Sequence, residues 1–232
     1  RLYSADESGV LVEEVREHDW KAAPPDEQKE LLYLWAMALW RMNKPLAAYR
    51  KMRRLLRMDP SQANVRQQLA GICCDLGRFE ESDRYYASAQ ALMPESSTLI
   101  CEWASMLYQA ERADEALLML ADAKNLCAMN PDFYLQRAYC WEEIDDPESA
   151  CSDMETYLTM NNDPSVKANL GNLYVETGEY DRAEKLLRDA VQEDSEGHWY
   201  LYDLAQCLRR KGELDEAESL AFKFIDVYPD DF

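Results

Sequence analysis

The sequence contains few of the residues that catalysis or metal binding requires. Its two histidines, His18 and His198, lie far apart, and no set of cysteines and histidines has the spacing of a zinc site. It also lacks a glycine-rich phosphate loop, a nucleophile elbow and a paired-carboxylate site. We therefore expect a protein that is not an enzyme and that has no metal and no cofactor.

Long apolar runs are also absent. The longest, from Leu31 to Trp40, is half of the ~20 residues that a bilayer-spanning helix needs, so we expect no membrane span. The seven cysteines are an odd number and cannot all pair within one chain, which favours a reducing, cytoplasmic location. Cys74 and Cys101 are expected at a binding surface. The other five fit as small interior residues: Cys73, Cys127, Cys140, Cys151 and Cys207.

Basic residues are outnumbered by acidic ones. The 25 Lys and Arg residues against 45 Asp and Glu residues give a net charge of −20 and a pI near 4.5. A polyanion of this kind repels nucleic acid and anionic membranes, so neither is an expected partner. With 232 residues, of which 47% are hydrophobic, the chain can still bury a sizeable core.

What the sequence does have is a repeat of about 34 residues, marked by small side chains. Each repeat carries two of them, separated by twelve positions. Helices that cross closely need small side chains at the contact, so each repeat is predicted to be a pair of packed helices. The six pairs are Ala36 with Ala48, Ala70 with Ser82, Ala104 with Ala116, Ala138 with Ala150, Gly171 with Ala183, and Ala205 with Ala217.

Turn-forming residues recur in phase with the small ones. Apolar residues around them have helical spacing, and no proline from Pro45 onward interrupts a helix interior. Each repeat therefore reads as two amphipathic helices joined by a turn. The turn place is held by Gly77, Gly178 and Gly212 in three repeats and by Asn43, Glu111 and Asp145 in the others.

This pattern resembles the tetratricopeptide repeat family, a helix–turn–helix repeat of about 34 residues. The resemblance is closest at Leu170, Gly171, Tyr174, Gly178, Tyr180 and Ala183, and at Leu69, Ala70, Gly77, Phe79, Tyr86, Ala89 and Pro94. It implies an all-α, right-handed superhelical solenoid with a concave groove lined by the first helix of each pair. The function it implies is a non-catalytic protein–protein interaction scaffold that holds a peptide or partner segment in this groove.

The alignment divides the chain into an acidic leader, residues 1–28, and six repeats. The repeats are 29–62, 63–96, 97–130, 131–163, 164–197 and 198–232. They depart from the family pattern at Ser82, where alanine is usual, at Arg66 and Lys167, where a bulky residue is usual, and at Tyr157 and Phe224, where alanine is usual. We expect these departures to affect local packing and not the fold.

The family's geometry assigns groove residues to this chain. Aromatic and amide side chains dominate the assigned places, and such side chains suit the recognition of a peptide. Burial of part of this wall against the next repeat is the alternative role for each of them. The candidate peptide-binding residues are Tyr33, Met37, Trp40, Gln67, Tyr108, Gln136, Tyr139, Asn169, Asn172, Trp199, Tyr202 and Gln206.

The family's best-known recognition device, a Lys and Asn clamp for the carboxy-terminal carboxylate of heat-shock chaperones, is missing. Tyr33, Met37, Gln68, Thr98 and Glu102 hold its places in the first frame, and the other frames fail similarly. We therefore predict no binding of chaperone tails.

The first repeat is basic in an otherwise acidic protein, with eight cations against two carboxylates. Three interpretations remain open: a solvated face without a role, docking of the acidic leader as a capping helix, and an external acidic or phosphorylated partner. Head-to-tail association with the strongly acidic fourth repeat is a related possibility. The basic patch consists of Arg50, Lys51, Arg53, Arg54 and Arg57 on the second helix.

The last repeat is not followed by a polar covering helix, so Leu220, Phe224, Ile225 and Tyr228 are expected to be partly exposed. An excised segment of a longer protein, or an interface such as a dimer, would account for this. Besides the scaffold function, two alternatives thus stay open. One is a regulatory or sensor module of a longer multidomain protein, and the other is a scaffold that self-assembles through its ends into a homo-oligomer.

Overall fold

The structure, a computed structural model, describes residues 22–194 and 199–227, and every regular element in this part of the chain is an α-helix. The chain divides into two compact units, residues 1–127 and 128–232. Unit 1 contains α2 (Pro25–Arg41), α3 (Pro45–Met58), α4 (Ala63–Asp75), α5 (Phe79–Gln90), α6 (Ser97–Gln109), α7 (Ala113–Asp122) and α8 (Lys124–Cys127). Unit 2 contains α9 (Pro131–Glu143), α10 (Pro147–Met160), α11 (Pro164–Thr177), α12 (Tyr180–Glu193), α13 (Trp199–Lys211) and α14 (Leu214–Val227).

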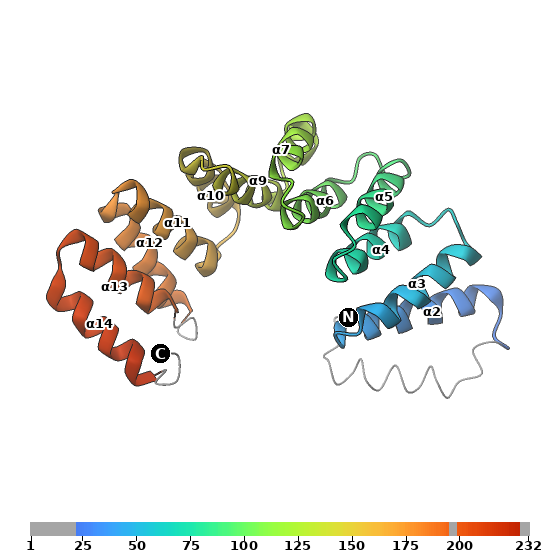
Figure 1. The fold of residues 1–232 in the computed structure, drawn as a ribbon, viewed down its shortest axis with the longest axis horizontal. Coiled ribbons are helices and arrows are strands. Elements are labelled where there is room, and N and C mark those ends of the chain that lie inside the picture. The colour runs from blue at the N-terminus through green and yellow to red at the C-terminus, as the bar shows by residue number, and fades with distance from the viewer. Residues whose placement is uncertain (1–21, 195–198, 228–232) are drawn as a thin grey trace. The chain divides into compact units, whose positions relative to one another are not determined.

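Consecutive helices form pairs in both units (Figure 1), and each pair is one of the predicted helix–turn–helix repeats. Helix starts follow the sequence rules, because proline occupies the first turn of α3, α9, α10 and α11. Side chains of Ser96, Asn130, Asp146 and Asp163 accept hydrogen bonds from backbone N–H groups at the starts of α6, α9, α10 and α11. Helix α2 begins at Pro25, inside the range assigned to the leader. The rest of the leader, including its predicted capping helix, lies outside the described residues.

All twelve small residues that define the repeat are buried, as predicted. Ala116 and Ala138, for example, have no exposed surface. At Gly171 the helices approach so closely that an added Cβ would lie 2.8 Å from Cγ of Leu187. Ser82 fits where alanine is usual because its hydroxyl donates to the carbonyl oxygen of Ala70, at 2.7 Å. The departure from the family pattern at Ser82 therefore leaves its buried hydroxyl with a hydrogen-bond partner.

The six turn residues in phase all have left-handed backbone. Gly77, Gly178 and Gly212 have φ of 67°, 84° and 96°, and Asn43, Glu111 and Asp145 have φ of 55°, 58° and 63°. The chain reverses between the two helices of a repeat in the same way each time, whether or not glycine is present. Where an ordinary residue such as Glu111 stands there, its Cβ makes this conformation unfavourable.

In each unit, one pair of successive first helices is in contact. The first helix α4 contacts α6, and α11 contacts α13, whereas second helices of successive pairs make no contact of similar extent in the described residues. These two pairs of first helices thus lie closer together than the second helices that accompany them. The predicted groove side of each unit is the side of its first helices, and the space between second helices opens on the other side.

One repeat contains a buried ion pair where its neighbour has two leucines. Arg137 of α9 donates two hydrogen bonds to Asp153 of α10, at 2.6 and 2.5 Å, and Asp153 is only 4% exposed. The indole N–H of Trp141 donates to the same carboxylate at 3.1 Å. The equivalent places in the next repeat hold Leu170 and Leu186, so the contact itself does not require charge.

Two sequence-based expectations are wrong. Phe224 was expected to be partly exposed, but it is 2% exposed because its ring packs against those of Trp199 and Tyr202, at centroid distances of 5.4 and 5.9 Å. Cys101 was expected at a surface, but it is 4% exposed. Leu220 is half-buried and Ile225 is 41% exposed, while Tyr228 lies outside the described residues.

Replacement of Glu111 by glycine is expected to stabilise the protein by about 0.5–1 kcal/mol, because the left-handed conformation costs a residue with a Cβ about 1–2 kcal/mol and glycine's extra freedom in the unfolded chain offsets part of the gain. Gly178→Ala is the opposite change. No atom lies within 4 Å of the added Cβ, so only backbone strain remains and stability should fall by about 1 kcal/mol. Urea unfolding measures both. Equal stabilities for the parent and the two variants would contradict the argument.

The Arg137→Leu variant is expected to lose about 3 kcal/mol of unfolding free energy, because the Asp153 carboxylate stays buried without its cation. The double variant Arg137→Leu/Asp153→Leu copies the Leu170 and Leu186 arrangement and should lie within about 1 kcal/mol of the parent. Urea unfolding of the parent, the single variant and the double variant gives the comparison. A double variant as unstable as the single one would show that the ion pair is not the source of the loss.

Candidate functional site

In unit 1, several predicted groove residues join neighbouring repeats. The ring of Trp40 lies against Gly71, where an added Cβ would be 2.8 Å from Cη2 of the indole, and the indole N–H donates to Asp75. Gln67 donates to Glu102 at 2.9 Å. The thiol of Cys74 lies 3.3 Å from Oε1 of Gln109, and Cys74 is half-buried. Trp40, Gln67 and Cys74 each bond a residue 35 positions further along, so these side chains act as struts between first helices.

The same arrangement occurs in unit 2. A side-chain hydrogen bond joins Tyr139 of α9 to Asn169 of α11, and another joins Asn172 of α11 to Asp203 of α13. These contacts occupy part of the hydrogen-bonding capacity of both amides. The alternative role of the groove residues, contact with the next repeat, therefore applies to three of the seven candidates in unit 2: Tyr139, Asn169 and Asn172.

The remaining predicted groove residues differ in accessibility. Tyr33 and Met37 are half-buried and pack against the core of unit 1, and Tyr108 and Gln136 are also half-buried. Gln206 is half-buried, and its side-chain oxygen accepts two hydrogen bonds from Arg209 at 3.0 and 2.6 Å. The exposed members with the largest side chains are Trp199 and Tyr202.

Trp199 and Tyr202 form an exposed aromatic pair on α13. They are 53% and 40% exposed, and their rings meet edge to face with centroids 6.3 Å apart. Tyr202 also lines a pocket of about 420 Å³ between α13 and α14, together with Ala205, Leu214, Ala217 and Phe224. The charged residues at this pocket are Arg209 and Glu218. The pair and the pocket together form an apolar surface that can hold an apolar side chain.

Two carboxyl groups on first helices of unit 2, Glu142 of α9 and Asp203 of α13, have raised pKa values. Burial raises the pKa of Glu142 above its ordinary value, and the nearby charge of Glu176 raises it further. Burial also raises the pKa of Asp203, against the effect of its hydrogen bond from Asn172. Their ionised forms are thus less stable than in water, and a cation beside them would be favourable.

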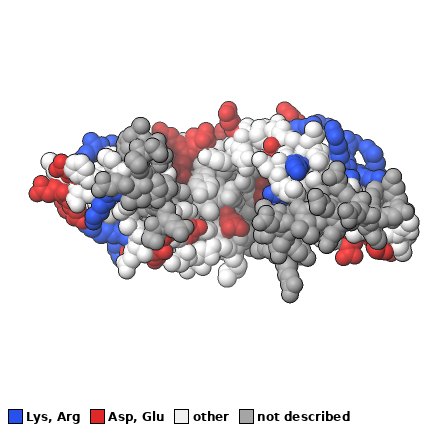
Figure 2. All heavy atoms as spheres, turned by 90° about the horizontal axis from the view of Figure 1, so that it is seen from below, with Lys and Arg blue, Asp and Glu red and all other residues white. Residues whose placement is uncertain are grey.

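The basic patch of α3 is only partly free in solvent. Arg50, Arg53, Arg54 and Arg57 are exposed, and Lys and Arg atoms gather at the right-hand end of the face drawn in Figure 2. Lys51, predicted among the outward cations, instead places its ammonium 3.2 Å from the ring centroid of Trp35. Arg53 donates to the hydroxyl of Tyr49, which itself donates to Glu81. The docking of the leader on this patch concerns residues outside the described part.

Metal-ligand clusters and disulfides are not found in residues 22–194 and 199–227. No group of three or more potential metal ligands occurs there, and all seven cysteines are free of disulfides. Burial raises the pKa of Cys73 and Cys140 to about 12, so these thiols stay protonated at neutral pH. None of the helices in these ranges has the length and apolar character to cross a bilayer.

The side of the second helices holds two pockets that the sequence-based prediction does not include. One, of about 440 Å³ in unit 2, lies between α10 and α12 over Leu170 and Tyr174, and an ion pair between Arg182 and Glu155 bridges its walls. The other lies in unit 1 over α6.

Comparisons with known proteins agree with this fold. Residues 169–230 match the family model described as tetratricopeptide repeat. Tetratricopeptide repeat protein 8 of Caenorhabditis elegans is 24% identical over 200 residues, which are 84% of this chain and 40% of that protein. The chain therefore spans about two fifths of the length of this relative.

Solved structures give the same result. PilF of Pseudomonas aeruginosa has a TM-score of 0.75 at 20% identity, covering 89% of this chain and 94% of that one. Cut9 in the APC/C hetero-tetramer Cut9–Hcn1 has a TM-score of 0.74 at 15% identity, covering 99% of this chain and 44% of that one. YrrB, described as a TPR protein with an unusual peptide-binding site, has a TM-score of 0.63 at 18% identity, covering 78% and 93%.

The predicted resemblance and fold class are thus confirmed. The described residues form an all-α array of helix–turn–helix repeats like those of tetratricopeptide repeat proteins, and residues 169–230 match that family's model. Folds of this class serve in general as scaffolds for protein–protein interaction.

The raised pKa of Glu142 leads to a pH-dependent prediction. A carboxyl group whose pKa is higher in the folded protein than in the unfolded protein destabilises the fold when it is ionised. This destabilisation is absent at pH values well below the ordinary pKa of the group. It is fully present at pH values above the raised pKa of the folded protein. Glu142→Gln should therefore raise stability at pH 7 by about 0.2–0.5 kcal/mol, a small effect because the site is partly solvated.

Thermal unfolding of the parent and of Glu142→Gln across acidic and neutral pH measures this effect. The difference between them should shrink as the pH falls. Glu143→Gln, which removes a charge from the neighbouring position, is the control. A gain for Glu142→Gln that persisted unchanged at acidic pH would contradict the assignment of the effect to this charge.

Proposed function

We propose that the first-helix side of unit 2 binds a peptide segment of a partner protein, and that the chain is a non-catalytic scaffold. The observation that supports this most is the exposed pair Trp199 and Tyr202 beside the apolar pocket between α13 and α14. Exposed aromatic rings give large contact area at low cost in conformational entropy, and they are typical of binding hot spots.

The surroundings indicate the chemistry of the segment. An apolar side chain of the partner fits the pocket of about 420 Å³, against Phe224 and Leu214. Raised pKa values at Glu142 and Asp203 show carboxylates that a cation would stabilise. A segment with an apolar anchor and a lysine or arginine satisfies both, whereas an acidic carboxy-terminal tail does not.

Related proteins support the same type of function. YrrB is described as having a peptide-binding site, and Cut9 is solved in a complex with Hcn1. Low identity to both means that the comparison supports a class of interaction and not a particular partner. The struts between repeats favour a preformed surface, since side chains such as Asn172 are held before any ligand arrives.

Trp199→Ala and Tyr202→Ala are expected to weaken the binding of peptides selected on the parent protein from a display library of short random sequences. The loss should be about tenfold or more for each, because each removes an exposed hot-spot ring. Fluorescence polarisation with the selected peptides measures it. Phe222→Ala is the matched control, since Phe222 is 57% exposed on α14 but does not line the pocket.

Circular dichroism shows whether each variant keeps its helices. Peptides that bind the folded Trp199→Ala and Tyr202→Ala variants as tightly as the parent would overturn the assignment to this face. Enrichment of acidic peptides over basic ones would overturn the proposed chemistry of the segment.

A further inference from the structure

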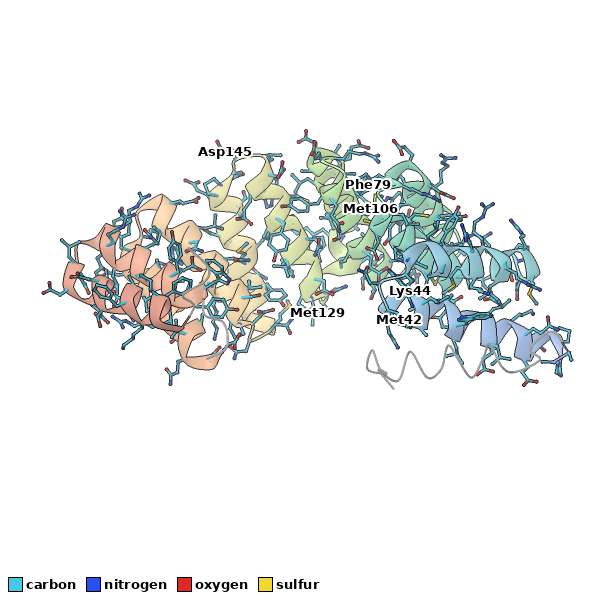
Figure 3. All side chains as sticks on the ribbon, turned by 60° about the horizontal axis from the view of Figure 1, so that its bottom comes forward. Met42, Lys44, Phe79, Met106, Met129 and Asp145 are labelled. Carbon is cyan, nitrogen blue, oxygen red and sulfur yellow. The ribbon has the colours of Figure 1, made fainter. Side chains whose placement is uncertain are left out.

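A pocket of about 570 Å³ lies in unit 1 on the side of the second helices. Its floor is α6, through Ile100, Trp103 and Leu107, and its walls are α5 and α7. Phe79 marks the start of α5 and Met106 lies on α6 in Figure 3. Because successive second helices make no extensive contact, the outer surface of α6 stays accessible between them. A volume of this size accommodates several side chains of a partner.

An ordered ionic network shapes one end of this pocket. Arg112, at the start of α7, pairs with Asp83 of α5 at 3.4 Å and with Glu115 at 2.7 Å. The indole N–H of Trp103 donates to Asp83 at 2.7 Å, and the Trp103 ring stacks on Tyr86 with centroids 6.2 Å apart. Trp103 is thereby held with part of its surface toward the pocket.

The charge of the pocket is negative. Three carboxylates line it, Asp83, Glu115 and Asp122, against the single cation of Arg112, which already bonds two of them. Asp122 is exposed at the end of α7 and forms no ion pair among the described residues. A lysine or arginine brought to Asp122 would meet an acceptor that nothing in this part of the chain neutralises.

Helix α7, which forms one wall of the pocket, carries an unusual exposed apolar residue. Leu118 is 71% exposed on α7, one helical turn before Asp122. Leu126 of α8, one turn beyond Asp122, is 41% exposed and lines the pocket. The place of Leu118 in the other five repeats is held by polar residues: Arg50, Arg84, Ser152, Lys185 and Ser219. Among the six repeats, leucine at this place thus occurs in the third repeat alone.

We propose that the pocket between α5 and α7 is a second docking site, which takes a basic amphipathic helix of another protein. Apolar side chains of the partner's helix enter the pocket against Trp103 and Met119 and cover Leu118. A lysine or arginine of the same helix pairs with Asp122. Charge complementarity selects this occupant, since the pocket is acidic and apolar together. A second copy of this chain is disfavoured because each copy carries a net charge of −20. The site lies on the second-helix side of unit 1 and shares no residue with the surface proposed above for unit 2.

The probe is a synthetic peptide with the sequence of residues 45–58, a basic amphipathic segment that contains Arg50, Lys51, Arg53, Arg54 and Arg57 and no acidic residue. The control peptide has glutamate in place of these five cations. Fluorescence polarisation with labelled peptides measures binding to the full chain. The basic peptide is expected to bind, and Leu118→Asp and Asp122→Lys should each weaken it about tenfold or more.

Matched variants test whether the effect is confined to this pocket. Ser152→Asp introduces a carboxylate at the equivalent place in unit 2, and Phe222→Ala removes an exposed ring that lines neither pocket, so neither should change the affinity by more than about twofold. Leu118 and Asp122 are exposed, so both pocket variants should fold, which circular dichroism verifies.

Three results would overturn the proposal. The first is no detectable binding of the basic peptide. The second is equal binding of this peptide to the parent and to both pocket variants, because that result would indicate attraction by net charge alone. The third is concentration-dependent association of the chain in sedimentation that Leu118→Asp abolishes, which would make the occupant a second copy.

Discussion

The close approach of two helices at small side chains is the contact on which the rest of the structure depends. Each repeat places a small residue of its first helix against one of its second, and all twelve are buried. At Gly171 the space is too narrow for a Cβ, and at Ser82 the added hydroxyl is accepted because it bonds Ala70 across the contact. Larger side chains would force the axes apart and separate every helix stacked beyond them.

Because this contact fixes the helix axes, the neighbouring contact within each repeat varies freely in chemistry. In the first repeat, this contact places the ammonium of Lys51 over the indole ring of Trp35. In the fourth repeat, it is the ion pair between Arg137 and Asp153. In the fifth repeat both places hold leucine. Because of this variation, the outer surfaces of the repeats differ in charge and polarity while their backbone structure is the same. The pocket over Trp103 and the ion pair at Arg182 are two results of it.

The stacking of repeats also decides which groove residues are accessible. Side chains such as Trp40, Gln67 and Asn172 bond the next first helix and hold the wall rigid. Among the described residues no further first helix packs on α13, and Tyr202 is 40% exposed beside a pocket. Rigid walls with a few accessible aromatic rings bind with little loss of entropy, which is why we place the proposed contact there.

The sequence by itself determined the repeat, its two helices and the left-handed turn at places such as Glu111, because period, small residues and turn residues are local properties of the chain. It also indicated which residues face the groove. Only the tertiary structure decided which of them are struts, that Phe224 is buried by Trp199, and that a pocket opens between α5 and α7. These outcomes depend on side chains of neighbouring repeats meeting in space, and spacing along one repeat does not specify such meetings.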